Sequence, residues 1–329
     1  MRFSVIIPVY NRPDESDELL ESLTRQTFKD FEVIVVEDGS TVPCAEVVEK
    51  YERLLSIHYY NKENSGPGQS RNYGAERSEG ENLIILDSDC VLPETYLSII
   101  DVELRREPAD AFGGPDRAHE SFTPVQKAIN YAMTSFFTTG GIRGGKKKLD
   151  KFYPRSFNMG IQKDVYISLG GFSAMRFGED IDFSIRIFKA GLRCRLFPEA
   201  WVWHKRRTDM KKFFKQVHNS GIARIELYKK YPESLKIVHL LPAAFTIGLL
   251  LILIVAPFCA WSLTLLALFA LIIFFDSSIK NKSLKIGTLS VVSAVIQLTG
   301  YGSGFIRAWW HRCVCGGPSF TAFDKNFYK

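Results

Sequence analysis

Short apolar runs alternate with amphipathic stretches through the first hundred residues of the chain. The apolar runs lie at residues 3–10, 31–36, 56–60 and 83–86. Stretches with helical spacing or helix-start signals follow the first three runs, at 15–26, at 45–55 and from Gly66 onward. Strands that alternate with helices predict a parallel sheet with right-handed crossovers. The sequence therefore predicts an α/β domain whose strands end at one common edge, where such sheets bind ligands.

The fourth run ends in two aspartates, in the sequence Leu83-Ile84-Ile85-Leu86-Asp87-Ser88-Asp89. A continuous apolar run is typical of a strand buried on both faces. Carboxylates at the carboxyl end of such a strand are well placed to hold Mg²⁺ or Mn²⁺ against a phosphate, because hard cations prefer oxygen ligands. The alternative is structural, since Asp and Ser also cap helices and begin turns.

The C-terminal third has a different pattern. Residues 240–275 are apolar and uncharged, and Pro257 divides them into two expected membrane helices, 240–256 and 259–275. Helices of about 17 residues are at the short end of what spans a hydrocarbon core. A third stretch, 286–306, is diluted by glycine, serine and threonine, so three placements stay open: it spans, lies in the interface or packs on the hairpin.

Charge placement predicts the orientation of these segments. Basic residues precede the first expected span, from Lys205 to Lys236, and follow the second, from Lys280 to Lys285. The positive-inside rule places both sets in the cytoplasm. No signal peptide is expected before Phe3, because the chain enters a core strand at once. The sequence therefore predicts a multi-pass protein of the inner (plasma) membrane, with a cytoplasmic catalytic domain and the Pro257 turn on the far side.

The segment 208–235 joins the soluble and apolar parts. Apolar side chains alternate there with Lys and Arg, which predicts amphipathic helices along the membrane surface, broken near 219–221. The alternative is a helix packed on its own domain. Residues 307–329 are expected to form a tail.

Overall charge and cysteine content indicate which classes of partner the chain can bind. The formal net charge of +6 favours an anionic leaflet and an anionic donor. Nucleic acid is excluded as a partner because no aromatic and basic RNA-binding module occurs. The six cysteines form no zinc pattern, so free thiols in a reducing cytosol are expected.

Several short motifs follow one another in a specific order. They are Val5–Asn11, Glu37–Ser40, Gly66–Gly68 with Arg71 and Asn72, Asp87–Asp89, Asn158–Gly160, Gly170–Phe172 and Gly178–Phe183. Together they resemble the successive signatures of family 2 glycosyltransferases with the GT-A fold, over about residues 1–224. The resemblance implies a Rossmann-like, mostly parallel catalytic domain at 1–207, with a nucleotide-sugar half at 1–112 and an acceptor half at 113–207. A C-terminal helical membrane region at 236–306 would follow it.

The resemblance also implies an activity: transfer of a sugar from a UDP- or GDP-linked donor to a lipid-linked or growing glycan, with Mn²⁺ or Mg²⁺ as cofactor. Direct attack assisted by a general base would invert the anomeric centre. Two alternatives stay open, a polyprenyl-phosphate glycosyltransferase and a catalytically silent membrane-bound binder of sugar nucleotides. A processive polymer synthase is disfavoured because the apolar region is too short for a translocation channel.

Site residues follow from the same resemblance. Those expected to bind the donor are Pro8, Val9, Tyr10, Asn11, Glu37, Asp38, Gly66, Arg71, Asp87 and Ser88. Those expected to hold the metal are Asp87, Asp89 and His204. The expected base is Asp180, with Glu179 in hydrogen bonds to the acceptor or a loop, because adjacent residues at a helix start point in different directions. The alternatives are a turn residue for Asp38, a surface residue for Arg71 and a structural role for His204. The loop from Gly140 to Lys151 is expected either to close over the diphosphate or to be an ordinary solvated loop.

Overall fold

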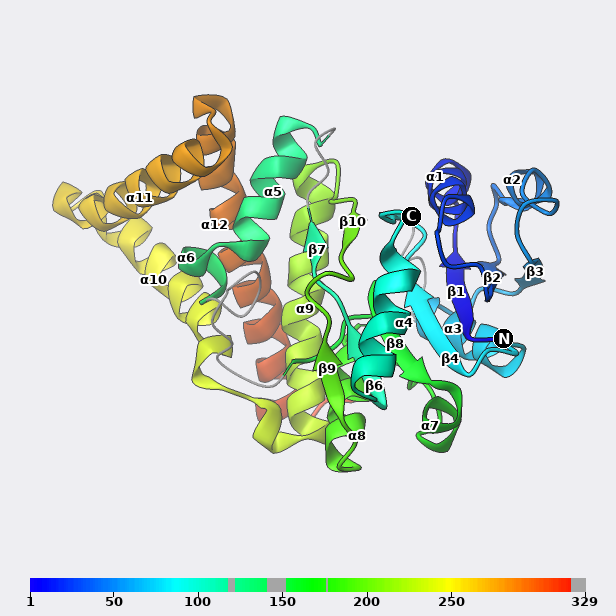
Figure 1. Cartoon of the computed structure of the whole chain (residues 1–329). Coiled ribbons are helices and arrows are strands. Elements are labelled where there is room, and N and C mark those ends of the chain that lie inside the picture. Colours follow the sequence, from blue (N-terminus) through cyan, green and yellow to red (C-terminus); the bar gives the residue numbers. More distant parts are fainter. Residues whose placement is uncertain (118–121, 141–151, 176, 321–329) are drawn as a thin grey trace. The chain divides into compact units, whose positions relative to one another are not determined.

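The computed structural model describes residues 1–117, 122–140, 152–175 and 177–320, which belong to two compact units (Figure 1). The first, here called the sheet unit, comprises residues 1–119 and 151–205. The second, the helical unit, comprises residues 120–150 and 206–329. The loop that was expected to close over the diphosphate lies, from residue 141 to 151, outside the described residues.

A seven-stranded sheet forms the centre of the sheet unit, in the order β3-β2-β1-β4-β8-β6-β9. The strands are β1 (Phe3–Val9), β2 (Phe31–Asp38), β3 (Ile57–Lys62), β4 (Asn82–Leu86), β6 (Ala111–Gly113), β8 (Asn158–Gln162) and β9 (Cys194–Leu196). The first four in this order are parallel, and β8 runs antiparallel to both neighbours. Every residue of β2 and β4 is buried, which explains why most of their residues are apolar. The predicted fold class is confirmed.

Helices connect these strands and complete the sheet unit. They are α1 (Pro13–Thr24), α2 (Ala45–Glu49), α3 (Pro67–Glu76), α4 (Tyr96–Arg106), α7 (Lys163–Ser168) and α8 (Glu179–Lys189). Helix α2 is shorter than the expected stretch 45–55, because the chain continues from residue 50 as turns. Carboxylates occupy the first turns of α1 and α8, where they complement the helix dipole.

A second sheet of three short strands brings distant segments together. Its order is β5 (Cys90–Val91), β10 (Val202–His204) and β7 (Asp116–Arg117). In the antiparallel pair of β5 and β10, His204 stands opposite Cys90. This register carries a residue from the end of the sheet unit to a place beside Asp89. The small sheet therefore positions the expected metal site.

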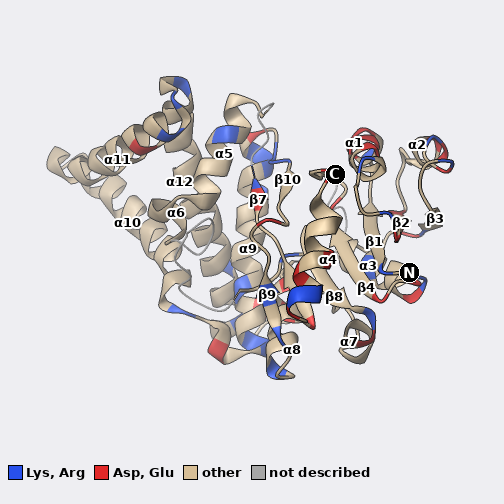
Figure 2. Ribbon diagram, viewed as in Figure 1, with Lys and Arg blue, Asp and Glu red and all other residues tan. Residues whose placement is uncertain are grey.

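The helical unit is built from helices of very different polarity. They are α5 (Pro124–Thr134), α6 (Phe136–Thr139), α9 (Met210–Lys230), α10 (Leu241–Val255), α11 (Thr264–Asn281) and α12 (Leu284–Trp309), followed by a π-helical turn at Trp310–Val314. Three segments are long and apolar enough to cross a membrane: 237–255, 260–281 and 284–314. Helix α10 carries no charged side chain, and those of α11 lie near its C-terminal end (Figure 2).

Helix α9 differs from the expectation at one point. It is continuous from Met210 to Lys230, so the break expected near 219–221 is wrong. Gly221 serves a close helix contact instead, because a Cβ at this position would lie 2.2 Å from the carbonyl oxygen of Tyr301 in α12. When only the sequence is known, a glycine inside a helical pattern suggests a break in the helix. Here it lets two helix backbones approach.

Candidate active site

Three elements of the sheet unit meet at Asp89. The residue follows β4, Arg12 follows β1 and His204 ends β10. One carboxylate oxygen of Asp89 pairs with the Arg12 guanidinium, and its Oδ1 lies 3.1 Å from His204 Nε2. The same His204 nitrogen lies 4.0 Å from Asp87 Oδ2. The structure therefore brings all three expected metal residues together.

The charge of Asp89 is strongly stabilised. Burial alone would raise the pKa of this carboxyl, but the opposite charges of His204 and Arg12 outweigh burial and hold the pKa well below its usual range. Asp89 is only 8% exposed and is therefore a charge kept inside the fold at neutral pH. Buried carboxylates persist only with such partners or with a metal ion.

Arg71 links the two halves of the expected site. Its side chain is 3% exposed; Nη2 donates to Asp87 Oδ1 at 2.6 Å, and Nη1 donates to Glu179 Oε1 at 3.1 Å. The guanidinium also lies 5.3 Å from the ring centre of Phe172. This buried arginine connects the end of β4 with the start of α8. The surface alternative for Arg71 is wrong, whereas its contact with a phosphate or a base stays a prediction.

The two candidate base residues have different surroundings. Burial, followed by the charge of Asp180, raises the pKa of Glu179 to about 7 against the opposing charge of Arg71. Asp180 Oδ2 pairs with Arg155 Nε at 3.0 Å, and its Oδ1 accepts a hydrogen bond from the Ile181 backbone at 2.8 Å. The adjacent carboxylates thus point to different arginines, as expected for neighbours at a helix start.

The raised pKa of Glu179 predicts a pH-dependent stability. The pKa is 4.5 for the ordinary group and about 7 in the fold, so the stabilisation is complete below pH 4.5 and is lost as the pH rises through 7. The full effect is on the order of 3 kcal/mol. We expect Glu179→Gln, which is neutral at every pH, to flatten the fall in unfolding temperature between pH 5 and 7.5. If the unfolding temperatures of both proteins fall equally with pH over this range, the raised pKa of Glu179 is contradicted.

Asp38 and Glu37 point away from each other at the end of β2. Asp38 Oδ1 accepts from the Ser65 backbone and its Oδ2 from the Gly66 backbone, each at 2.9 Å, and Lys62 pairs with it. Its carboxylate therefore orders the loop before α3. Glu37 is fully buried and accepts hydrogen bonds from Ser40, Cys44 and Tyr59. The contact of Glu37 with the donor stays a prediction, because these three hydrogen bonds all come from neighbouring residues of the protein.

The other expected donor residues occupy the loops at the same sheet edge. Asn11 has a φ of +52°, and its Oδ1 accepts hydrogen bonds from the backbones of Thr41 and Val42 at 2.8 and 2.9 Å. Asparagine tolerates this left-handed conformation better than most residues. Asn11 thereby ties the loop after β1 to the loop after β2. Of the remaining residues, Pro8 and Val9 end β1, Tyr10 follows it, Ser88 is buried between the two aspartates, and Gly66 precedes α3.

Three residues of the site were missed from sequence. Arg12 and Arg155 pair with the candidate carboxylates, and Asn72 ties α3 to the loop before α8. Asn72 Oδ1 accepts from the Phe172 backbone at 2.8 Å, and its Nδ2 donates to the Phe172 carbonyl at 2.9 Å. Asn72 stood within a quoted motif, and Arg12 directly followed one. The isolated Arg155 gave no signal.

The residues present fit a divalent cation. Asp89 Oδ1 is buried beside His204 Nε2, and the buried His204 Nδ1 has no hydrogen-bond partner among the described residues. Asp89, Cys90 and His204 offer ligand atoms within 4.8 Å of one another. Burial raises the pKa of the Cys90 thiol, and its Sγ lies 3.5 Å from the Phe157 carbonyl oxygen. A neutral thiol is a poor ligand for hard cations, so the oxygens of Asp87 and Asp89 with His204 are the better set.

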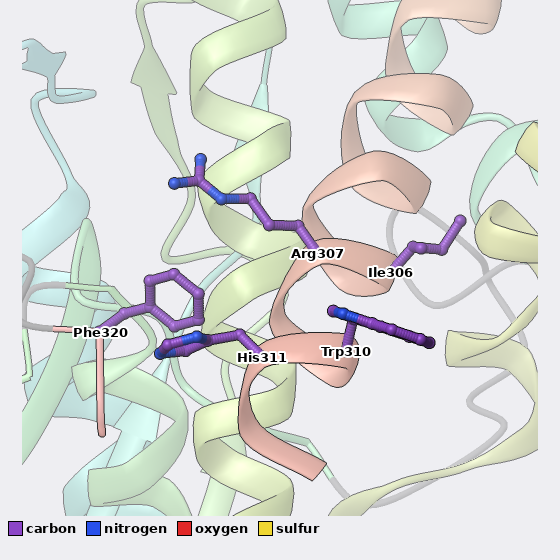
Figure 3. Close-up of a pocket in the computed structure, with 5 residues that line it drawn as sticks. All are labelled: Ile306, Arg307, Trp310, His311 and Phe320. Carbon is purple, nitrogen blue, oxygen red and sulfur yellow. The ribbon is translucent and has the colours of Figure 1, made fainter. Parts of the chain in front are cut away.

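A hollow of about 520 Å³ lies elsewhere, in the helical unit (Figure 3). It is lined by Ile306, Arg307, Trp310, His311 and Phe320. Figure 3 shows the Arg307 guanidinium extending away from Trp310 and the His311 ring lying close to Phe320. The hollow contains none of the predicted site residues.

Comparison with protein families decides the class. The model of glycosyl transferase family 2 matches residues 4–176, which include β1, the aspartates after β4 and the chain up to the loop before α8. The chain belongs to glycosyl transferase family 2. Since this family consists of glycosyltransferases, the chain is an enzyme, and the resemblance found in its motifs is confirmed.

Among relatives of this family 2 glycosyltransferase is a protein from Haemophilus influenzae named as an uncharacterized glycosyltransferase. The two are 33% identical over 193 residues, which is 56% of this chain and 62% of the relative. The chain thus spans less than two thirds of that protein's length.

Solved structures show the same fold. Staphylococcus aureus TarS 1-349 in complex with UDP aligns with a TM-score of 0.51 and 23% identity over 68% of this chain and 65% of that one. The mannosyltransferase PcManGT from Pyrobaculum calidifontis, in complex with GDP-Man and Mn²⁺, aligns with a TM-score of 0.59 and 17% identity. That alignment covers 94% of this chain and 87% of the other. The GT-A fold is therefore shared.

Proposed function

We propose that this enzyme is a metal-dependent, inverting glycosyltransferase. It moves a sugar from a nucleotide-diphosphate donor to a lipid-linked or growing glycan at the cytoplasmic face of the inner membrane. The observation that carries the proposal is one connected cluster: Asp89 and His204 beside Asp87, joined through Arg71 to Glu179, the neighbour of Asp180. A donor site and an acceptor site in direct contact are what group transfer requires.

The donor half would hold the nucleotide. Asp38 lies at the carboxyl end of β2, where the base of a nucleotide can reach it, and Asn11 orders the loop beside it. Asp87, Asp89 and His204 would hold Mn²⁺ or Mg²⁺, which when bound neutralises charge on the diphosphate leaving group. The solved relatives support such a donor, since they contain UDP or GDP-Man, one of them with Mn²⁺.

The acceptor half would supply the base. Asp180 takes the proton of the acceptor hydroxyl, whose oxygen forms a bond to the anomeric carbon while the bond from that carbon to the diphosphate oxygen breaks. Attack from the face opposite the leaving group inverts the configuration at that carbon. Arg155 pairs with Asp180 Oδ2 at 3.0 Å and would hold the carboxylate in position. Glu179, held by Arg71, would orient the acceptor or the loop.

Membrane attachment limits the kinds of acceptor that the enzyme would use. Residues 247–265 of the helical unit expose many large apolar side chains, including Leu250, Leu251, Ile254 and Leu265. An apolar surface of this size is typical of contact with lipid. A membrane-bound enzyme gains most from an acceptor that is itself anchored in the membrane, which favours a lipid-linked glycan.

Donor binding gives the most direct test. We expect UDP- or GDP-linked sugars to raise the unfolding temperature of the full chain when Mn²⁺ is present and to raise it little when EDTA replaces the metal. A donor at 100 times its Kd stabilises the fold by about 2.7 kcal/mol. Absence of any shift across UDP-, GDP-, ADP-, CMP- and dTDP-linked sugars would contradict the proposal. Free nucleosides at the same concentration serve as the matched ligand control.

A further inference from the structure

Helix α12 lies along α9, and the two run in the same direction. Ser293 Oγ lies 3.5 Å from Met210 Sδ, Ser303 Oγ lies 3.0 Å from His218 Nδ1, and Arg312 Nε lies 2.8 Å from Glu226 Oε1. These contacts begin at the start of α9 and continue past the end of α12. The C-terminal two thirds of α12 therefore lie at the same depth, relative to a membrane, as α9.

Helix α9 is too polar to cross a bilayer. Its charged side chains are Lys211, Lys212, Lys215, Arg224, Glu226, Lys229 and Lys230. Each charge at the centre of a bilayer is costly. A crossing α12 would carry Arg224 and His218 into the hydrocarbon with it. The same pair of helices fits the membrane surface, where one polar side faces water and one apolar side faces lipid.

The hairpin of α10 and α11 is too short to cross from that surface. Helix α10 contacts α12 near its start, where a Cβ on Gly302 would lie 2.3 Å from the Pro242 carbonyl oxygen and Thr246 Oγ1 lies 3.4 Å from the Leu298 carbonyl oxygen. Beyond Thr246 the leg runs from residue 247 to the turn at Pro257. At 1.5 Å per residue this leg reaches about 17 Å, against a hydrocarbon core of about 30 Å.

The turn of the hairpin is built for an apolar environment. No charged residue occurs between 240 and 275, and at the tip Phe258 is 89% and Trp261 83% exposed. Backbone N–H groups within hydrocarbon must be satisfied inside the protein. Those that donate to nearby carbonyls within this turn are the N–H groups of Ala256, Phe258, Cys259, Ser262 and Thr264, and Pro257 has none to satisfy.

We propose that the C-terminal region is a re-entrant anchor. Helices α9 and α12 lie in the plane of the membrane surface, and the α10–α11 hairpin enters the facing leaflet and returns without reaching the other side. The hollow lined by Arg307, Trp310 and His311 then lies at the level of the lipid headgroups, where cationic and aromatic side chains are favoured (Figure 3). This arrangement replaces the multi-pass hairpin expected from sequence. It keeps Arg307 and Arg312 on the same side as the other basic residues.

Native cysteines provide the test. Cys259 lies in the turn, Cys313 and Cys315 follow α12, and all three are exposed, whereas Cys44 and Cys90 are buried. One variant keeps Cys259 (Cys194→Ser, Cys313→Ser, Cys315→Ser), and a second keeps the C-terminal pair (Cys194→Ser, Cys259→Ser). A membrane-impermeant maleimide is applied to sealed vesicles of each orientation. Lys282→Cys, in a chain without the four accessible cysteines, reports the side of the loop between α11 and α12.

We expect the C-terminal pair to be labelled from the same side as the Lys282→Cys control. Cys259 should resist labelling from both sides and react fully once detergent dissolves the vesicles. Labelling of the pair from the side opposite the control would show that α12 crosses, and labelling of Cys259 in intact vesicles would show that the turn reaches water. Either result overturns the re-entrant anchor. Both leave the proposed sugar transfer intact, because donor binding is measured separately on the detergent-solubilised chain.

Discussion

Asp89→Asn is expected to abolish metal-dependent sugar transfer and to weaken donor binding at the same time. Asp89 contacts both His204 and Arg12, and asparagine removes its charge while keeping its shape. Charge stabilisation of a leaving group is commonly worth about 10²- to 10³-fold in turnover. We expect at least that loss in initial rate, together with loss of the Mn²⁺-dependent shift in unfolding temperature on addition of donor.

A matched control removes the same charge nearby. Asp14 is an exposed residue in the first turn of α1, close in sequence to Arg12. Asp14→Asn should keep turnover and donor binding near those of the unaltered chain. Near-normal turnover of Asp89→Asn in the presence of a chelator would show that Asp89 holds no metal needed for transfer.

Asp180→Asn is expected to lower turnover while donor affinity stays unchanged. Asparagine cannot accept the proton of the acceptor, and loss of a general base typically costs about 10²- to 10⁴-fold, or roughly 3 to 5 kcal/mol of barrier. The Asp180 carboxylate pairs with Arg155, so its replacement leaves the contacts of Arg71 with Asp87 and Glu179 in place. Calorimetric binding of the donor beside initial rates measures the two effects separately.

Glu179→Gln is the informative comparison for this residue pair. It weakens a direct partner of Arg71 and through Arg71 disturbs Asp87, so both donor affinity and turnover should change. If Asp180→Asn instead loses donor affinity as badly as Asp89→Asn, the base assignment fails and Glu179 is the better candidate. Unchanged turnover of Asp180→Asn would point to a polyprenyl-phosphate acceptor, because a phosphate nucleophile needs little help from a base.

The parts of this enzyme that depend on burial could be predicted from sequence. The strands β1, β2 and β4 are enclosed on both faces, so their composition alone marks them, and the polar residues after them mark the binding edge. Motif order then identified the family. The structure also brings Asp87, Asp89 and His204 together, although the short pairing of β5 with β10 that does so has no sequence pattern of its own. Their role as metal ligands stays a prediction.

Contacts between residues that lie far apart in sequence could not be predicted from composition or motif order. Arg12 and Arg155 contact carboxylates far from them in sequence, and a single arginine in a loop carries no periodic signal. The role of Gly221 was misjudged because the residue it approaches, Tyr301, lies in a helix whose position depends on the whole helical unit. Such contacts follow from three-dimensional packing, and local sequence propensity carries no information about them.

The position of His204 at the end of β10 has a consequence for biosynthesis. β10 is the last strand of the sheet unit, and it pairs with β5 directly after Asp89. On the ribosome, Asp87 and Asp89 emerge long before this histidine does, and they wait as an incomplete set while the intervening chain is made. The completed set forms only when α9 begins to leave the exit tunnel. A nascent chain would therefore bring Asp87, Asp89 and His204 together only as the first long helix of the C-terminal region follows the sheet unit out of the tunnel.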